Sequence, residues 1–588
     1  MRLKIISLFW KKGWVSVLIT ACSIAYLLDF TWLKWGDLIV DVGREMYVPW
    51  QLFLGKVLYR DIHYLYGPFS PYFNAFLFKL FGANVYSLVL SGVITICAVS
   101  ALIYKISRIF LDIFFSTFTV LTFLLVFAFG QYVYYGNYNF VIPYSYPAIH
   151  GMMFAFAALY CFYLSMLKDK KRYKVFYIVF LIAAFLCRIE IGLFLVLSIA
   201  ILSLKELKYL IIPCASAAIL YSLFFALSGS SLGKSSILDT AFANINASNP
   251  FTSWLLAGED ILGGLMDMFK GFLYYILFSI FFAAGGFILA YTLRFKKVFN
   301  RIFCSFFIGF IFTWTGFIFF RKLFVNYAAQ YKSLPLISLA VLLISMWQFI
   351  RGGYSKKKLF LAVLCLFSLF LMSRMLFYVW AGHYGFYIVL PGLIIYHVFF
   401  LRILPERLKE EWSRKFFRFG YMFIFILFVI SHLNISRFCY ANKTLKIDSE
   451  KGTLQLVNAD REKRFKELID FLKMNTSERE TLVVFPEGLG INFFSGMENP
   501  LYFNMYLPLD LARGNIVDRV ISEMEDKEID YVALTQRDTT EYGYPAFGKD
   551  YATDIMQYIR ENYTLYKQFG PFPFTTREYG IALFKRKI

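Results

Sequence analysis

Long apolar runs recur along the chain, and short segments rich in Lys and Arg separate them. A membrane-spanning helix needs about 20 apolar residues, or about 17 at the short end. The run 174–204 fits either one long helix or two short ones. The predicted helical segments are 13–34, 84–105, 109–130, 148–167, 174–188, 190–204, 209–228, 271–293, 302–320, 333–350, 359–380, 386–402 and 417–435. This pattern predicts a polytopic α-helical membrane protein with about 13 transmembrane helices.

The charges of the loops predict how these segments are oriented. Short loops rich in Lys and Arg are typical of the cytoplasmic side of a membrane. Placing every basic cluster there gives a consistent alternation only if 174–204 is a hairpin, with Arg188 and Glu190 at its tip. The N-terminus is then cytoplasmic. The loop 35–83 and everything after about residue 436 then lie on the outer side.

Composition agrees with a membrane protein. The chain has 588 residues, of which 59% are hydrophobic and 21% aromatic, more than a soluble protein carries. A net charge of +21 would by itself suggest nucleic acid. Because the basic residues gather in loops between apolar runs, we expect membrane lipids as partners and no nucleic acid. No Cys/His cluster has the spacing of a zinc site, and no disulfide framework is predicted.

The polar tail predicts a small C-terminal α/β domain at 440–588, after a membrane module at 1–435. Helical periodicity covers 460–474, 515–526 and 550–562, and strand-like runs cover 481–485, 531–535 and 579–585. Pro486-Glu487-Gly488 has the composition of a turn that leads into a helix. We expect this domain to act as a lid or scaffold, without a part in catalysis.

The loop after the first apolar run holds the densest cluster of charges. It contains Asp41-Val42-Gly43-Arg44-Glu45, followed by Arg60 and His63. Asp41 and Glu45 share one face of a helix, where a carboxylate can act as a general base. A structural interpretation is also open, in which Asp41 caps a short helix and Glu45 pairs with Arg44 or Arg60. Spacing alone favours the structural interpretation.

Several basic residues fall on the predicted outer side, against the general trend. Fixed cations there would hold the charge of a phosphate leaving group. Interfacial snorkelling or pairing with local acids explains them equally well. Glu190, an acid inside an apolar hairpin, either forms an ion pair with Arg188 at the turn or positions an acceptor or phosphate. The candidate donor-phosphate residues are Arg188, Glu190, Arg321, Lys322 and Arg374.

These features resemble the GT-C glycosyltransferases, in particular the bacterial protein O-mannosyltransferase and aminoarabinose transferase group. An acidic residue directly follows the first span, a long outer loop comes next, and an outer α/β tail closes the chain. The motifs that carry the resemblance are Asp41-Val-Gly-Arg-Glu, Leu58-Tyr-Arg-Asp-Ile, Tyr66-Gly-Pro-Phe-Ser, Cys187-Arg-Ile-Glu, Phe547-Gly-Lys-Asp-Tyr and Asn562-Tyr563.

The resemblance implies a sugar donor linked to polyprenyl phosphate and an inverting transfer at the outer face of the bacterial plasma (inner) membrane. The acceptor would be a lipid, a glycan or a protein, and a divalent metal is compatible with the group. Asp41 matches the expected base, supported in the first loop by Arg44, Glu45, Arg60 and His63. The second acid of the family has no match in 131–147, and the lipid-phosphate lysine has none before Gly67-Pro68.

Two other functions remain open for a chain of this kind. A lipid or sugar transporter, or a flippase, would move its substrate without glycosyl transfer. Such proteins often contain internal repeats, and this sequence has no convincing one. A noncatalytic scaffold of the same fold is the third possibility, and it would fit if Asp41 lay far from any cavity. The polar outer loops and the large tail favour the glycosyltransferase.

Overall fold

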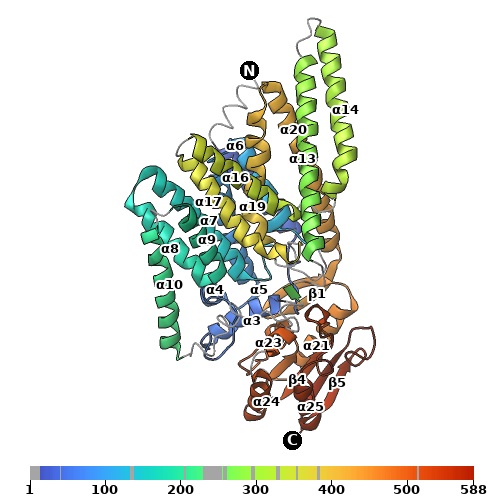
Figure 1. Cartoon of the computed structure of the whole chain (residues 1–588). Helices are drawn as coiled ribbons and strands as arrows, with labels where there is room; N and C mark the ends of the chain where they lie inside the picture. The colour runs from blue at the N-terminus through green and yellow to red at the C-terminus, as the bar shows by residue number, and fades with distance from the viewer. Residues whose placement is uncertain are drawn as a thin grey trace.

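A helical bundle and a smaller region that contains β-sheet make up the molecule, seen one above the other in the computed structural model (Figure 1). The structure describes residues 13–39, 41–132, 138–203, 207–229, 254–255, 261–292, 298–325, 331–352, 355–379, 385–477, 479–512 and 515–587. Within these ranges it describes the backbone but not the side chains at 208, 228, 298–303, 317 and 320–325.

Each apolar run predicted from the sequence contains a helix. The bundle helices are α2 (Trp14–Phe30), α5 (Val85–Ser107), α6 (Ile113–Thr122) with η1 (Phe123–Ala128), α7 (Tyr146–Lys168), α8 (Lys171–Cys187), α9 (Ile189–Leu202), α10 (Leu207–Ser228), α13 (Ile261–Thr292), α14 (Val298–Val325), α16 (Leu334–Gly352), α17 (Lys356–Met372), α19 (Leu390–Val398) with η6 (Phe399–Ile403), and α20 (Glu411–Ala441). Within the described residues, eight helices are long and apolar enough to cross a membrane. The chain is therefore a multi-pass membrane protein, while the number of 13 spans stays a prediction.

The run 174–204 forms two helices. Helix α8 ends at Cys187 and α9 begins at Ile189, because Arg188 between them has an extended backbone (φ −146°, ψ 120°). The Gly67 amide of the first loop donates a hydrogen bond of 3.1 Å to the Cys187 carbonyl. This bond satisfies one of the carbonyls that a helix leaves open at its C-terminus. The predicted break at Arg188 is thus confirmed.

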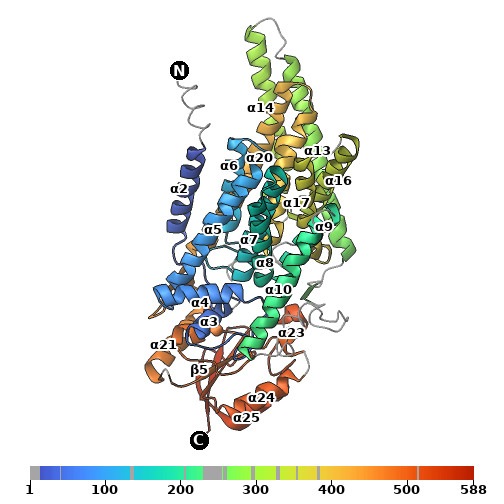
Figure 2. The same ribbon diagram turned by 90° about the vertical axis from the view of Figure 1, so that its left-hand side faces the viewer.

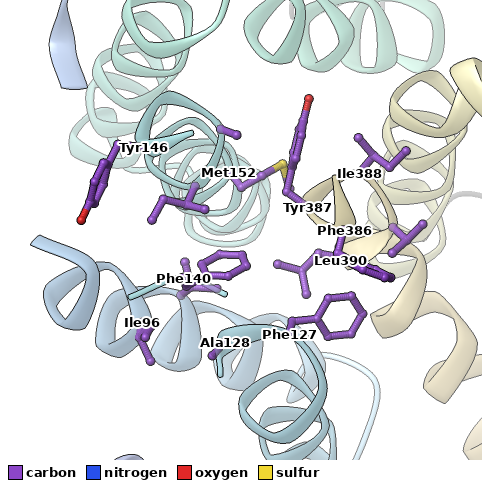
Figure 3. Close-up of a cluster of buried hydrophobic side chains, with 14 of the residues drawn as sticks. Ile96, Phe127, Ala128, Phe140, Tyr146, Met152, Phe386, Tyr387, Ile388 and Leu390 are labelled. Atoms are coloured by element: carbon purple, nitrogen blue, oxygen red, sulfur yellow. The ribbon is translucent and has the colours of Figure 1, made fainter. Parts of the chain in front are cut away.

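The core of the bundle is built from apolar and aromatic side chains of several helices (Figure 3). Aromatic rings meet mainly edge to face, as for Phe123 and Phe140, whose ring centroids lie 5.2 Å apart at 89°. The Tyr387 hydroxyl points away from the apolar cluster. The labelled members of the cluster are Ile96, Phe127, Ala128, Phe140, Tyr146, Met152, Phe386, Tyr387, Ile388 and Leu390.

The C-terminal region combines two sheets with short helices. Strands β1 (Lys443–Ser449) and β2 (Gly452–Val457) pair antiparallel, and a second sheet has the order β3-β4-β6-β5 with β3 parallel to β4. The strands of the second sheet are β3 (Leu482–Phe485), β4 (Tyr531–Thr535), β5 (Tyr563–Phe569) and β6 (Ile581–Arg586). The helices of the C-terminal region are α21 (Asp460–Asn475), α22 (Leu489–Ser495), α23 (Pro508–Leu511), α24 (Ile516–Asp526) and α25 (Thr553–Asn562).

The three helices and three strands predicted for this tail are all present. The sequence did not predict β1, β2 or β5. In β5 the five central residues are all exposed, so the strand lacks the alternation of buried and exposed positions by which strands are recognised.

Two helices of the first loop, α3 (Val42–Phe53) and α4 (Phe69–Phe81), lie between the bundle and the C-terminal region (Figure 2). Every residue of α3 except Phe53 is buried, including the charged Arg44 and Glu45. Buried charges are costly unless they are paired, so the contacts of α3 determine what this loop does.

Candidate functional site

Asp41 stands at the entry to α3 with an unusual backbone. Its φ of +60° with a ψ of −48° lies in a region that residues other than glycine rarely adopt. Such conformations cost about 1–3 kcal/mol and gather at active sites. The residue occupies the N-cap position, but its side chain makes no capping hydrogen bond. The helix-cap interpretation is thus right for the position and wrong for the bond. The Asp41 side chain stays 33% exposed.

Arg44 joins Asp41 and Glu45. Its guanidinium is 3% exposed, with Nη2 at 3.2 Å from Asp41 Oδ1 and Nε at 3.4 Å from Glu45 Oε1. Glu45 also accepts hydrogen bonds from the Tyr64 hydroxyl at 3.4 Å and from the Tyr146 amide at 3.1 Å. Glu45 is therefore a buried carboxylate with hydrogen bonds to both of its oxygens, which suits support of the site. Asp41 is the acid that reaches solvent.

Burial governs how these acids ionise. Desolvation raises the pKa of Asp41 above its ordinary value, and the positive charges of Arg44 and Arg537 oppose the rise. Desolvation also raises the pKa of Glu45, again opposed by Arg44. A carboxylate with a raised pKa is a stronger base once it is ionised, which suits proton abstraction near neutral pH.

Tyr66 connects this cluster with the hairpin between α8 and α9. The guanidinium of Arg44 lies 5.3 Å from the centre of the Tyr66 ring, and that of Arg188 lies 4.2 Å from it. The approach depends on Gly67, because a Cβ atom there would collide with the Leu186 carbonyl of α8. The structure therefore brings the predicted base and the predicted phosphate residue Arg188 into one chain of contacts.

Arg188 is 5% exposed and has both acidic and neutral partners. Its Nη1 lies 3.2 Å from Glu190 Oε1 and donates to the Tyr387 hydroxyl at 2.6 Å. The ion pair at the hinge, one of the two interpretations open for Glu190, is therefore present. The Nε atom of Arg188 is buried and has no hydrogen-bond partner among the described residues. A buried donor of this kind is rare and calls for a ligand or an ordered water.

The other predicted residues occupy mixed positions. Arg374, in the turn η4 (Ser373–Leu376), acts electrostatically on Tyr387, the partner of Arg188. Arg60 is half exposed and pairs with Asp61, so within the described contacts it does not join Glu45. Arg321 and Lys322 belong to the last turns of α14, and their side chains lie outside the described part of the chain.

His63 contacts the C-terminal region through its backbone. Its amide donates to the Tyr502 carbonyl at 2.8 Å, and its carbonyl accepts from Asn504 Nδ2 at 2.8 Å. The residue thus fastens the first loop to the tail. A supporting role of His63 in the site stays a prediction.

Sequence reasoning missed two charged residues of the tail, Glu487 and Arg537. Glu487 Oε1 accepts a hydrogen bond of 3.1 Å from the Asp41 amide, and Arg537 Nε lies 3.3 Å from Glu487 Oε2. One signal was available. Each residue comes two positions after the end of a buried strand, β3 or β4, and functional groups often gather at the carboxyl ends of parallel strands.

The acids of the site do not form a metal centre on their own. Over the described ranges, no group of three or more His, Cys, Asp or Glu side chains is placed to hold a metal ion. Asp41, Glu45 and Glu487 are each paired with an arginine. The divalent metal compatible with the sequence stays a prediction, and we derive no step through it.

Comparison with solved structures identifies the fold class. The chain superposes on an oligosaccharyltransferase from Archaeoglobus fulgidus tethered to an acceptor peptide that contains the NVT sequon, with a TM-score of 0.50 and 11% identity over 98% of this chain and 75% of that one. It also matches ArnT from Cupriavidus metallidurans bound to undecaprenyl phosphate, with a TM-score of 0.46 and 12% identity over 97% of this chain and 98% of that one.

The chain therefore shares the overall fold of this solved oligosaccharyltransferase, in agreement with the fold that the resemblance noted in the sequence implies. No protein-family model matches the chain, and no curated protein matches it by sequence.

Proposed function

We propose that the protein is an inverting glycosyltransferase that moves a sugar from a polyprenyl-phosphate-linked donor to an acceptor. One observation carries the proposal. The solvent-reaching carboxylate of Asp41 and the buried guanidinium of Arg188 belong to one connected site, with Arg44 and Tyr66 between them. A base and a fixed cation within one connected site match the two charges that such a transfer develops.

The proposed reaction forms one bond to the anomeric carbon and breaks another. A hydroxyl or amine of the acceptor attacks the anomeric carbon of the sugar and loses its proton to Asp41. The bond between that carbon and the phosphate oxygen breaks, and the electron pair leaves with the lipid phosphate. Attack from the face opposite the leaving group inverts the anomeric configuration.

Arg188 is the residue best suited to receive the lipid phosphate. Guanidinium groups bind phosphate through paired N–H donors, and the Nε donor of Arg188 is not used within the described protein. Glu190 and Tyr387 hold the guanidinium from the Nη1 side. Arg374 adds positive charge nearby, and Arg321 and Lys322 stay candidates for the same task.

The positions of these residues suggest where the reaction takes place. The first loop and the C-terminal region lie together at one end of the helical bundle (Figure 1). We propose that this end is the outer face of a bacterial plasma membrane. Residues 1–435 would form the catalytic membrane module, and residues 440–588 an extracytoplasmic domain. The acceptor is a lipid, glycan or protein.

The test is transfer in proteoliposomes with a labelled polyprenyl-phosphate sugar as donor, comparing the wild type with Asp41→Asn. Loss of a general base lowers the rate about 10²- to 10⁴-fold. Asp61→Asn is the matched control, since Asp61 is a first-loop acid paired with the exposed Arg60, and it should leave the rate unchanged. Unchanged turnover in Asp41→Asn would refute the assignment. Movement of the lipid without transfer would support the transporter.

A further inference from the structure

The C-terminal region reaches the proposed base through two charged residues on neighbouring strands. Glu487 follows β3, and Arg537 follows β4; these strands are parallel and directly paired. Their carboxyl ends therefore meet at one edge of the sheet, and that edge faces α3. Glu487 is 4% exposed, so its carboxylate contacts other groups of the protein and hardly reaches solvent.

Glu487 holds the backbone of Asp41. Its Oε1 accepts from the Asp41 amide at 3.1 Å, while its Oε2 receives Arg537 Nε at 3.3 Å. Arg537 is held in turn by Glu541, with Nη2 at 2.6 Å from Oε1. The bond to Asp41 is made at the residue with the strained backbone, so the tail stabilises the conformation from which the carboxylate projects.

Two glycines allow the tail to approach this closely. A Cβ on Gly43 would collide with the Gly490 nitrogen, and a Cβ on Gly490 would collide with the Leu38 carbonyl. The Gly490 amide donates a hydrogen bond of 3.2 Å to that same carbonyl. The first loop and the start of α22 therefore touch backbone to backbone, immediately beside Asp41.

Other contacts fasten the loop on both sides of Asp41. Upstream, Arg461 Nη2 lies 2.6 Å from Asp37 Oδ2. Downstream, the Tyr47 hydroxyl accepts from the Asn499 amide at 2.7 Å. The tail therefore contacts the first loop upstream of the proposed base, at the base and downstream of it. A mobile lid would not make contacts on all three sides.

We propose that Glu487 and Arg537 are positioning residues of the active site, through which the C-terminal region holds Asp41 in its working conformation. This inference rests on the proposed function of Asp41. It replaces the lid or scaffold role that the sequence suggested for the tail.

The first test measures the contact without reference to activity. Hydrogen exchange of the backbone amides in 38–46 is compared in full-length wild type, Glu487→Ala and Glu487→Gln. Glu487→Ala removes the acceptor and should raise exchange at the Asp41 amide about tenfold or more. Glu487→Gln keeps an acceptor oxygen and should stay within about threefold of the wild type. Exchange in Glu487→Ala equal to the wild type would overturn the proposal.

The second test separates positioning from substrate binding. With the labelled polyprenyl-phosphate sugar, Glu487→Ala should lower kcat about 10- to 100-fold and leave KM within about threefold, because a misplaced base slows the chemical step. Glu528→Gln is the matched control, since Glu528 also pairs with an arginine of the tail, Arg586, at 3.3 Å and in an exposed position. A kcat in Glu487→Ala equal to that of the control would overturn the proposal.

The third test covers the case in which Glu487→Ala does not fold. The wild-type profile of kcat against pH should contain an inflection near neutral pH to which Glu487 contributes, and Glu487→Gln should shift or abolish it. An identical profile in both proteins would overturn the proposal. If the wild type transfers no sugar, the proposed function fails by itself, and the exchange measurement still decides the contact. The ionisable groups that act on Glu487 or face it are Asp41, Arg44, Arg537, Glu541, Tyr542 and Tyr551.

Discussion

Replacing Arg44 by Gln tests how the buried charges of α3 stabilise the fold. Arg44 is 3% exposed and Glu45 is 2% exposed, with 3.4 Å between Arg44 Nε and Glu45 Oε1. Removing one member of a buried ion pair typically costs about 3–5 kcal/mol, because the remaining charge loses its compensation. Glu45 keeps its hydrogen bonds from Tyr64 and Tyr146, so we expect the lower half of that range for Arg44→Gln.

The assay is reversible unfolding of the purified protein in mixed detergent micelles, with the free energy of unfolding compared across variants. The double variant Arg44→Gln with Glu45→Gln removes the uncompensated carboxylate as well. It should recover about 1–2 kcal/mol relative to Arg44→Gln alone. Lys56→Gln is the matched control, because Lys56 pairs with Glu498 at 3.0 Å while both side chains are partly exposed. It should cost about 1 kcal/mol at most.

Two results would refute this reasoning. Arg44→Gln should cost clearly more stability than Lys56→Gln. Equal losses in the two would show that the buried pair contributes no more than a surface pair. A double variant less stable than Arg44→Gln would show that Glu45 is not strained by the loss of its partner. Either outcome would show that the buried ion pair of Arg44 and Glu45 does not stabilise the fold in the way described.

The remaining predictions concern the donor site and the contact with the tail. Arg188→Lys should raise the KM for the polyprenyl-phosphate sugar about tenfold, measured by donor titration, because an ammonium lacks the paired donors of a guanidinium. Burial raises the pKa of Glu487 to about 7, so the folded protein binds this proton more tightly than the unfolded chain. The stabilisation that comes from this proton is therefore complete at low pH and is lost as pH rises from about 4.5 to about 7. The free energy of unfolding should fall by about 2.5 kcal/mol between pH 5 and pH 8, and Glu487→Gln should lack this loss. Gly43→Ala should cost about 1–3 kcal/mol by forcing the backbone of Gly490 away, whereas Gly309→Ala, with open space around it, should not destabilise the protein.

The sequence predicts the helices well, because a membrane span is defined by length and hydrophobicity alone. The break at Arg188 could also be predicted, since only a hairpin agrees with the distribution of loop charges. By contrast, the exposed strand β5 has no alternating pattern, and its place at the edge of the sheet depends on pairing with β6.

The candidate site could be predicted only in part. Asp41, Arg44 and Glu45 are visible as a charge cluster beside a span, and they do lie together. Glu487 is separated from Asp41 by 446 positions, and no local pattern links residues so far apart. Their contact is produced by the docking of the tail on the first loop, which is a property of tertiary packing.

The most direct test of the central claim is a structure of the protein with polyprenyl monophosphate, the leaving group of the proposed reaction. A phosphate oxygen should lie about 3 Å from the Arg188 guanidinium, in a cavity that also receives the Asp41 carboxylate. A phosphate bound elsewhere, with Asp41 and Arg188 outside its cavity, would contradict the claim.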